Sequence, residues 1–253
     1  KTDGSVDPSG GPKDGMIRTQ KDYQWVLDMQ AAGYQFAQGN PNPNLATDGS
    51  ARTNGLYYGD LIYADNNGDK IFGNANDAKF MNINTSPKFI FGIVANASWN
   101  GFDFSMLWAA ASGKKYYWNQ TYFNSTKIGI GGQIPLRIAE NHYYYDPNNT
   151  YGIPNNVNAK FPRLKQSDAI DNIASDFWFY DASYAKLKNL SIGYTFSVDK
   201  WGGTQNYIKG LRLYVSGENL LTITKYPGPD PEAGTGVNYP LLRQFAVGVN
   251  LRF

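Results

Sequence analysis

The last thirteen residues constrain the fold of this chain more than any other segment. They read LLRQFAVGVNLRF, from Leu241 to Phe253, and they alternate between apolar and small or polar side chains. Because successive side chains of a β-strand point to opposite faces, this alternation predicts a strand with one apolar and one polar face. At roughly 3.3 Å per residue such a strand is about 43 Å long, and at a tilt near 45° it covers about 30 Å, the thickness of a membrane's hydrocarbon layer.

The composition is typical of a β-barrel with aromatic girdles, polar loops and tight turns. Of 253 residues 15% are aromatic, and the chain has 19 Tyr and 27 Gly. No apolar run approaches the roughly eighteen residues that a helical span requires, so helical membrane spans are excluded. A net charge of +2 without a basic stripe gives no reason to expect a nucleic-acid partner. The absence of cysteine removes disulfides and the best ligands for zinc.

Residues 1–87 are expected to form an extracellular loop region with a short helix and a short strand. The N-terminal end is polar and rich in Gly and Pro, with no initiator Met and no signal peptide, so we expect a piece of a longer protein. Thr19 and Asp22 have the spacing of a capping box, which predicts a helix that ends at Gly33. The strand is expected at residues 56–64.

A short acidic stretch, DNNGDKI from Asp65 to Ile71, resembles a calcium-binding loop. Oxygen-bearing side chains recur at its first, third and fifth positions, so Asp65, Asn67 and Asp69 are candidate ligands for Ca²⁺. The match is incomplete, because Lys70 stands where a glycine is expected and a later glutamate is missing. A turn of Asn, Asp and Gly between two strands explains the stretch equally well.

Two long amphipathic strands joined by a minimal turn are expected between residues 88 and 111. Residues 88–99 and 102–111 each carry large apolar side chains at alternate positions. Asn100-Gly101 between them is the strongest signal for a two-residue hairpin, because both positions of a type I′ turn require a positive φ. Three further strands are expected at 184–197, 211–222 and 241–253.

The lengths of the connections support an antiparallel barrel formed by residues 88–253. If Phe253 lies at the periplasmic end, the short turns lie at that end and the long connections lie at the other, as in outer-membrane barrels. Arg212 and Glu218 are then expected to face the interior. Lys186 and Lys188 are expected to share the lipid-facing side, at the level of anionic headgroups.

The longest connection, residues 112–176, contains clusters of aromatic residues among Asn, Gly, Pro and Lys. Aromatic side chains on outward loops can stack against sugar rings or apolar ligand groups. The alternative is that they pack the loops together or belong to the interfacial girdle. The candidate substrate contacts are Tyr116, Tyr117, Trp118, Tyr122 and Tyr144.

The sequence gives little support to an enzymatic function. The chain has a single histidine, His142, so any Ser-His or histidine-metal centre would depend on that residue. Its three glutamates show no spacing that suggests the carboxylate pair of a glycoside hydrolase. No glycine-rich loop for binding phosphate is present either. We therefore do not expect an enzyme.

One long motif resembles a known family. DASYAKLKNLSIGY, from Asp181 to Tyr194, is similar to the D-A-S-Y-x-(R/K)-L-(R/K)-N-(L/I)-(T/S)-(L/I)-G-Y segment of SusC/RagA-type TonB-dependent outer-membrane transporters. Further agreement extends over about residues 56–253 and covers the C-terminal part of that architecture. The other matching elements are Gly59-Asp60, Pro87-Lys88-Phe89, Gly101-Phe102-Asp103, Ser216-Gly217-Glu218-Asn219-Leu220 and Tyr226-Pro227-Gly228 with Asp230-Pro231.

The resemblance implies an all-β fold in which this chain supplies five to six strands of a barrel of about twenty-two. It also implies a plug domain inside the barrel, a SusD-like lipoprotein as a lid, and import of oligosaccharides or peptides driven through TonB. The implied location is the outer membrane of a Gram-negative bacterium. So few strands cannot close a barrel, so the remaining strands and the plug are expected from another part of the transporter.

Two other functions are compatible with the sequence. A secreted β-sandwich that binds carbohydrate through its aromatic loops would have similar alternating strands, but its apolar faces would be buried between two sheets. A passive porin would share the barrel fold and lack the plug. Both alternatives stay open on the sequence alone.

Overall fold

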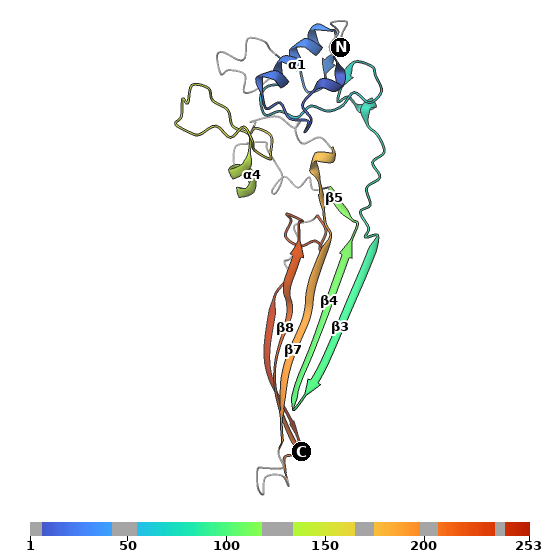
Figure 1. The fold of residues 1–253 in the computed structure, drawn as a ribbon, viewed down its shortest axis with the longest axis vertical. Coiled ribbons are helices and arrows are strands. Elements are labelled where there is room, and N and C mark those ends of the chain that lie inside the picture. The colour runs from blue at the N-terminus through green and yellow to red at the C-terminus, as the bar shows by residue number, and fades with distance from the viewer. Residues whose placement is uncertain (1–6, 42–54, 118–133, 165–174, 198–206, 236–240) are drawn as a thin grey trace. The chain divides into compact units, whose positions relative to one another are not determined.

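The computed structural model describes residues 7–41, 55–117, 134–164, 175–197, 207–235 and 241–253 (Figure 1). The chain forms two compact units. The first contains Lys1–Met81 and Asn119–Trp178, and the second contains Asn82–Trp118 and Phe179–Phe253. No helix among these described residues is long and apolar enough to cross a membrane. The boundary expected after residue 87 stays a prediction.

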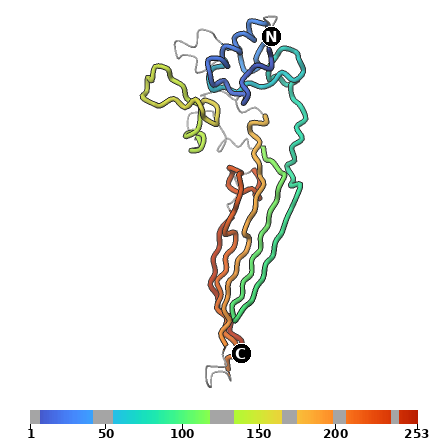
Figure 2. The backbone as a smooth tube through the Cα atoms, in the orientation of Figure 1, coloured from blue at the N-terminus to red at the C-terminus, as the bar shows by residue number. Residues whose placement is uncertain are grey.

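The second unit contains a five-stranded antiparallel sheet in the order β3-β4-β7-β8-β9 (Figures 1 and 2). Each strand pairs with the next described long strand along the chain, so the sheet is a simple meander. The five strands expected between residue 88 and the C-terminus are therefore confirmed, with small shifts at their ends. Their bounds are Phe89–Trp99 for β3, Phe102–Ser112 for β4, Tyr184–Phe196 for β7, Gly210–Thr224 for β8 and Gln244–Arg252 for β9.

The register places the large apolar side chains of all five strands on one face. Directly paired residues of an antiparallel sheet point to the same side. The series Ala97, Phe104, Ile192, Val215 and Val247 runs across the sheet through such pairs. The following residues share this apolar face: Phe89, Phe91, Ile93 and Trp99 of β3, Phe102, Met106 and Trp108 of β4, Leu187, Leu190 and Tyr194 of β7, Leu211, Leu213 and Leu221 of β8, and Phe245, Val249 and Leu251 of β9.

The opposite face is mainly small and polar. One row of pairs crosses it through Asn96, Ser105, Ser191, Ser216 and Ala246. Arg212 and Glu218 lie on this face, as expected from the alternation in β8. The apolar exceptions are Ile90, Val94 and Leu107, on β3 and β4.

A β-bulge corrects the expectation for Lys186 and Lys188. Leu107 pairs with Asn189 but Trp108 pairs with Leu187, so Lys188 is an extra residue in β7. An extra residue reverses the alternation beyond it. Lys186 therefore lies on the polar face, where it is buried, and not on the apolar face beside lipid headgroups.

The turn between β3 and β4 has the conformation that the sequence predicts. Asn100 has φ 47° and Gly101 has φ 89°, and Trp99 pairs directly with Phe102. Positive φ at both positions is the signature of a type I′ turn. By register this turn lies at the same end of the sheet as the last residues of β9.

Two short sheets accompany the large one. In the first unit β1 (Gln35–Phe36) pairs with β2 (Ile71–Phe72), and in the second β5 (Lys115–Tyr117) pairs with β6 (Phe179–Asp181). The strand expected at residues 56–64 was wrong. That segment forms turns with a single bridge from Leu61 to Met16, because its backbone groups bond to separate residues of other segments, Gly15, Ile17 and Arg163, and not to a continuous neighbouring strand.

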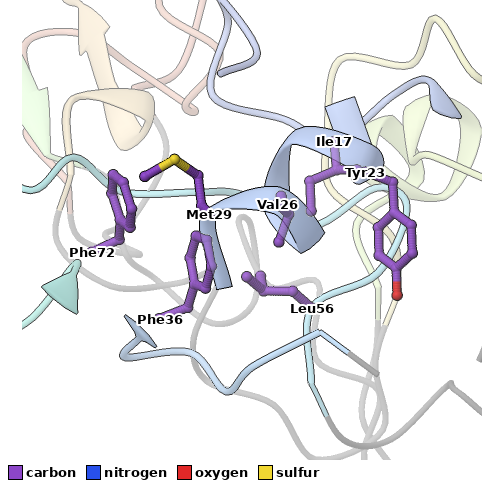
Figure 3. Close-up of a cluster of buried hydrophobic side chains, with 7 residues drawn as sticks. All are labelled: Ile17, Tyr23, Val26, Met29, Phe36, Leu56 and Phe72. Atoms are coloured by element: carbon purple, nitrogen blue, oxygen red, sulfur yellow. The ribbon is translucent and has the colours of Figure 1, made fainter. Parts of the chain in front are cut away.

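The first unit is built on the expected helix, α1 (Gln20–Ala31), which begins with the capping box of Thr19 and Asp22. The described residues of this unit also contain four shorter helices, η1 (Pro8–Gly10), η3 (Ala75–Asp77), α4 (Leu136–Asn141) and η5 (Asp176–Trp178). One face of α1 packs into an apolar cluster with the loops around it (Figure 3). The buried members of this cluster are Ile17, Tyr23, Val26, Met29, Phe36, Leu56 and Phe72.

Gly193 of β7 offers a sharp test of the register on the polar face. A Cβ at this position would lie 2.6 Å from both Arg212 Nη2 and Asp103 Oδ1, which form an ion pair across it. We expect Gly193→Ala to separate the pair and to destabilise the sheet by about 1 kcal/mol, the low end for overpacking. Gly92→Ala in β3 is the control, because its nearest atom would be a carbonyl oxygen at 3.9 Å. Urea titration of the folded full-length protein on heat-modifiability gels measures the stability of both variants. Equal unfolding midpoints for the two variants would contradict the assigned packing.

Candidate binding surfaces

The apolar face of the sheet is uncovered in the described chain. Val247 is 80% exposed, Phe245 74% and Trp99 77%, and the other large apolar side chains of that face on β3 and β9 are at least half exposed. A contiguous apolar surface that extends over five strands is rare on soluble monomers and marks a site that contacts lipid or protein. The secreted sandwich predicts that these residues are buried between two sheets, and the described chain supplies no second sheet over them. This surface is suited to lipid.

The polar face carries an ion pair that crosses one strand. Arg212 Nε donates to Asp103 Oδ1 at 2.8 Å, over the backbone of Gly193. The guanidinium also lies 4.8 Å from the ring centroid of Tyr214, whose ring covers Gly248 so closely that a Cβ there would lie 2.3 Å from it. Glycine at both positions gives these large side chains space to lie flat against the sheet.

A second charged cluster joins the start of β7 to the segment that follows β8. Lys186 Nζ donates to Asp230 at 2.6 and 2.7 Å and to Glu232 at 2.8 Å, and its side chain is 1% exposed. Lys188 Nζ donates to the same Glu232 oxygen at 2.5 Å. The other oxygen of Glu232 accepts from the Tyr184 hydroxyl at 2.8 Å.

A third lysine completes this cluster from the β4–β5 connection. Lys114 is buried, and its Nζ donates to Pro231 O at 2.6 Å and to the Tyr116 hydroxyl at 3.1 Å. It also lies over the rings of Tyr116 and Tyr184, at 4.8 and 5.0 Å from their centroids. The sequence did not indicate this cluster, because its members are far apart in the chain and meet only through the strand register.

The five candidate substrate contacts have different surroundings. Tyr116 packs edge-on against Tyr226 and bonds Lys114, so it takes part in the charged cluster. Tyr117 is half buried and packs against Phe179 in the small β5–β6 sheet. Tyr144 forms a two-bond bridge with Asn156, and its hydroxyl is buried without a hydrogen-bond partner among the described residues. Trp118 and Tyr122 lie outside the described residues, and substrate contact by the five stays a prediction.

The candidate calcium ligands form a network of Asx-type turns. Asp65 accepts hydrogen bonds from the N–H groups of Gly68 and Lys70, and Asn67 Oδ1 accepts from Asp69 N. Asp69 accepts from Ile71 N and from the side chains of Asn67 and Asn74. The Asn67 and Asn74 amides hold the pKa of Asp69 below its usual range.

This network does not form a ready oxygen cage. Both carboxylate oxygens of Asp65 and of Asp69 are directed at N–H donors, and a cation would have to replace those bonds. Among the described residues no group of three or more His, Cys, Asp or Glu is arranged to hold a metal ion. Calcium binding by Asp65, Asn67 and Asp69 stays a prediction. The residue that organises the turn is Asp77, which accepts four backbone N–H bonds and was not identified from the sequence.

A buried ion pair holds the first unit together. Arg163 Nε donates to Asp60 Oδ1 at 2.6 Å, and the Asp60 side chain is fully buried. The adjacent Gly59 has φ 86°, and a Cβ there would lie 2.5 Å from the ring of Tyr143. Burial raises the pKa of Tyr143, whose hydroxyl donates to Arg18 O. These contacts give a physical reason for the Gly59-Asp60 motif, in which glycine allows the aromatic ring to approach and aspartate binds the arginine.

His142 has a structural position. Its Nδ1 lies 2.8 Å from Ala139 O and 3.2 Å from Ile138 O, at the C-terminal end of α4. Carbonyl oxygens only accept hydrogen bonds, so Nδ1 carries a proton and caps the helix. The described part of the chain places no nucleophile or carboxylate in a hydrogen bond with this ring.

Comparison with known proteins identifies the relatives of this chain. No family model matches it. TonB-dependent receptor P3 of Formosa agariphila is 31% identical over 77% of the chain, and TonB-dependent receptor SusC of Bacteroides thetaiotaomicron is 27% identical over 88%. Two solved structures of the RagAB peptide importer match about three quarters of the chain, with TM-scores of 0.57 and 0.58 and identities of 29% and 27%. The chain belongs to the SusC/RagA family of TonB-dependent receptors.

This SusC/RagA-type chain is one part of a larger architecture. It spans about a fifth of the length of the curated relatives it matches (19% of receptor P3 and 22% of SusC) and 21% of the solved RagAB chains. Proteins of the family lie in the outer membrane and are transporters, not enzymes. The outer-membrane location expected from the sequence is thereby confirmed.

Removal of Arg163 tests the buried ion pair of this SusC/RagA-type chain. We expect Arg163→Met to destabilise the first unit by about 3–5 kcal/mol, because it leaves the buried Asp60 carboxylate without its cation. Hydrogen exchange of the α1 amides in the full-length receptor measures this loss of stability. The double variant D60N/R163M removes both charges and is expected to recover part of the protection. Equal exchange rates in wild type and R163M would show that the ion pair does not stabilise the first unit.

Proposed function

We propose that this chain forms part of the barrel wall of an outer-membrane transporter that imports oligosaccharides or peptides. The observation that carries the proposal is the sheet itself, which has one continuous exposed apolar face and one mainly polar face. Lipid on the first face and a protein-filled or watery interior on the second satisfy both sets of side chains. A soluble sandwich would need a second sheet over this apolar face, and the described residues supply none.

The rest of the barrel is proposed to come from the other part of the receptor. In the described chain β3 and β9 are the edges of the sheet, and each pairs on one side only. Unpaired backbone groups are costly in lipid, and five strands are too few for a closed barrel. Both edges therefore require further strands, which agrees with a barrel of about twenty-two strands.

The partners and the energy source follow from the family and are part of the same proposal. We propose import driven through TonB, a plug in the barrel, and a SusD-like lipoprotein as an outer lid. The solved relatives are described as a peptide importer, which makes peptides the first substrates to test for this chain. Oligosaccharides are the second class, with contacts proposed at Tyr116, Tyr117, Trp118, Tyr122 and Tyr144.

Adjacent residues of β9 test which face meets lipid. Val247 lies on the apolar face and Ala246 on the polar face, and both are exposed in the described chain. We expect Val247→Arg to reduce the folded receptor in the outer membrane strongly, since an arginine near the middle of a lipid face costs about 2–4 kcal/mol. Ala246→Arg, the matched control, is expected to cost about 1 kcal/mol or less. Fractionation and heat-modifiability gels measure the amount of folded receptor in the outer membrane for each variant. An equal loss of folded receptor in the two variants would count against a lipid-facing surface.

Uptake by whole cells tests the transport function. We expect deletion of the receptor, of TonB, or of the proposed SusD-like lipoprotein to abolish growth on oligopeptides or oligosaccharides as sole nutrient, with monomers as the control. Growth that is independent of TonB would favour a passive porin. Receptor found only in the soluble secreted fraction would favour the carbohydrate-binding sandwich.

A further inference from the structure

Residues 226–235, which follow β8, are attached to the sheet through ion pairs with Lys186 and Lys188. Two acids of this segment, Asp230 and Glu232, bind Lys186 of β7. Lys186 and Tyr184 project from the polar face, so the segment lies on that side, at the end of the sheet opposite the Asn100-Gly101 turn. Nothing in the barrel-wall proposal requires such an attachment.

We propose that residues 226–235 form a strap, fastened to the polar face by the buried Lys186, and that the strap stays in place while the transporter works. Only the second part of this inference, that the strap stays in place during transport, rests on the proposed function. The fastening itself is a property of this chain. It follows that the movements of a transport cycle take place in other segments.

The first support is the burial of the central cation. Lys186 is 1% exposed, while Asp230 and Glu232 are 12% and 22% exposed at their side chains. Its ammonium group reaches three carboxylate oxygens at 2.6 to 2.8 Å. Removal of one member of such a group leaves the others charged and poorly hydrated, so detachment is strongly opposed.

The second support is a set of contacts that do not involve Lys186. Lys114 donates to Pro231 O, the Tyr184 hydroxyl to Glu232, and the Tyr226 hydroxyl to Gly234 O. These bonds fix the segment from the β4–β5 connection, from β7 and from within. The strap is therefore held at several separate points.

The third support is the stiffness of the segment itself. It contains Pro227, Pro229 and Pro231, each of which fixes its own φ. A Cβ at Gly228 would lie 2.3 Å from the ring of Tyr226, so the chain folds tightly over that ring. A stiff segment loses little conformational entropy when it is fastened.

The fastening is expected to be insensitive to ordinary pH. Burial raises the pKa of Glu232, but hydrogen bonds from Lys186, Lys188 and Tyr184 outweigh it and lower the pKa from 4.5 to about 2. Because the folded pKa is the lower one, this stabilisation is complete above about pH 4.5 and is lost as the pH falls toward 2. The charged or titratable groups around Glu232 are Lys114, Tyr184, Lys186, Lys188 and Asp230.

A spin label on the strap tests the fastening. The chain has no cysteine, so Thr235→Cys, with any cysteines elsewhere in the receptor replaced, gives one labelling site in the full-length receptor. We expect an immobile nitroxide between pH 8 and pH 5 and, in Lys186→Met, a mobile fraction that grows at least several-fold. Lys209→Met is the matched control, because Lys209 is exposed and lies beyond the cluster. A mobile label in wild type, or the same spectrum in K186M and K209M, would overturn the strap.

A second measurement tests whether the strap stays in place during transport. Spectra of the same label are compared in energised cells and in cells treated with an uncoupler, and uptake is recorded in parallel. The proposal expects identical spectra, and a shift on uncoupling would overturn it. Absence of TonB-dependent uptake with an immobile label in wild type and a mobile one in K186M would refute the transporter while leaving the fastening intact.

Discussion

Backbone pairing in a fixed register is the constraint on which the rest of this structure depends. A slip of one residue between two strands would send every side chain of one strand to the other face. The register from β3 to β9 instead keeps five apolar sets together, and it separates them from the serines, the ion pair and the charged cluster on the other side. Membrane location, interior contacts and the strap all follow from that separation.

Glycine and charge have complementary roles on the polar side. Gly193 and Gly248 remove side chains where Arg212 and Tyr214 must lie flat, and Gly59 does the same for Tyr143 in the first unit. The charges are paired in each case: Asp103 with Arg212 on the sheet, and Asp60 with Arg163 in the first unit. Close backbone approach and paired charge together allow long polar side chains to pack against a sheet or a core without an uncompensated group.

Much of the fold was predictable from the sequence, and much less of the candidate sites. The long strands, the type I′ turn and the capped helix are local patterns of alternation, spacing and residue type, so they can be identified without a structure. The strand at 56–64 was wrong because short apolar runs do not specify a pairing partner, and the backbone of that segment bonds to separate residues of distant segments. The charged cluster depends on Lys114, Lys186, Asp230 and Glu232, which only tertiary pairing brings together. The Asp65–Asp69 spacing indicated oxygen ligands, whereas the hydrogen bonds there serve the backbone.

The position of Lys188 shows how a single surplus residue can change the chemistry of a strand. Simple alternation would have directed Lys186 outward, where hydrocarbon or headgroups would meet its ammonium group. The bulge rotates the start of β7 by one step, and the same lysine becomes the counter-ion of two acids that come from a loop about forty residues further along the chain. If Lys188 paired regularly instead of forming the bulge, the same sequence would place the positive charge of Lys186 on the lipid-facing side of the wall, although no residue would have been altered.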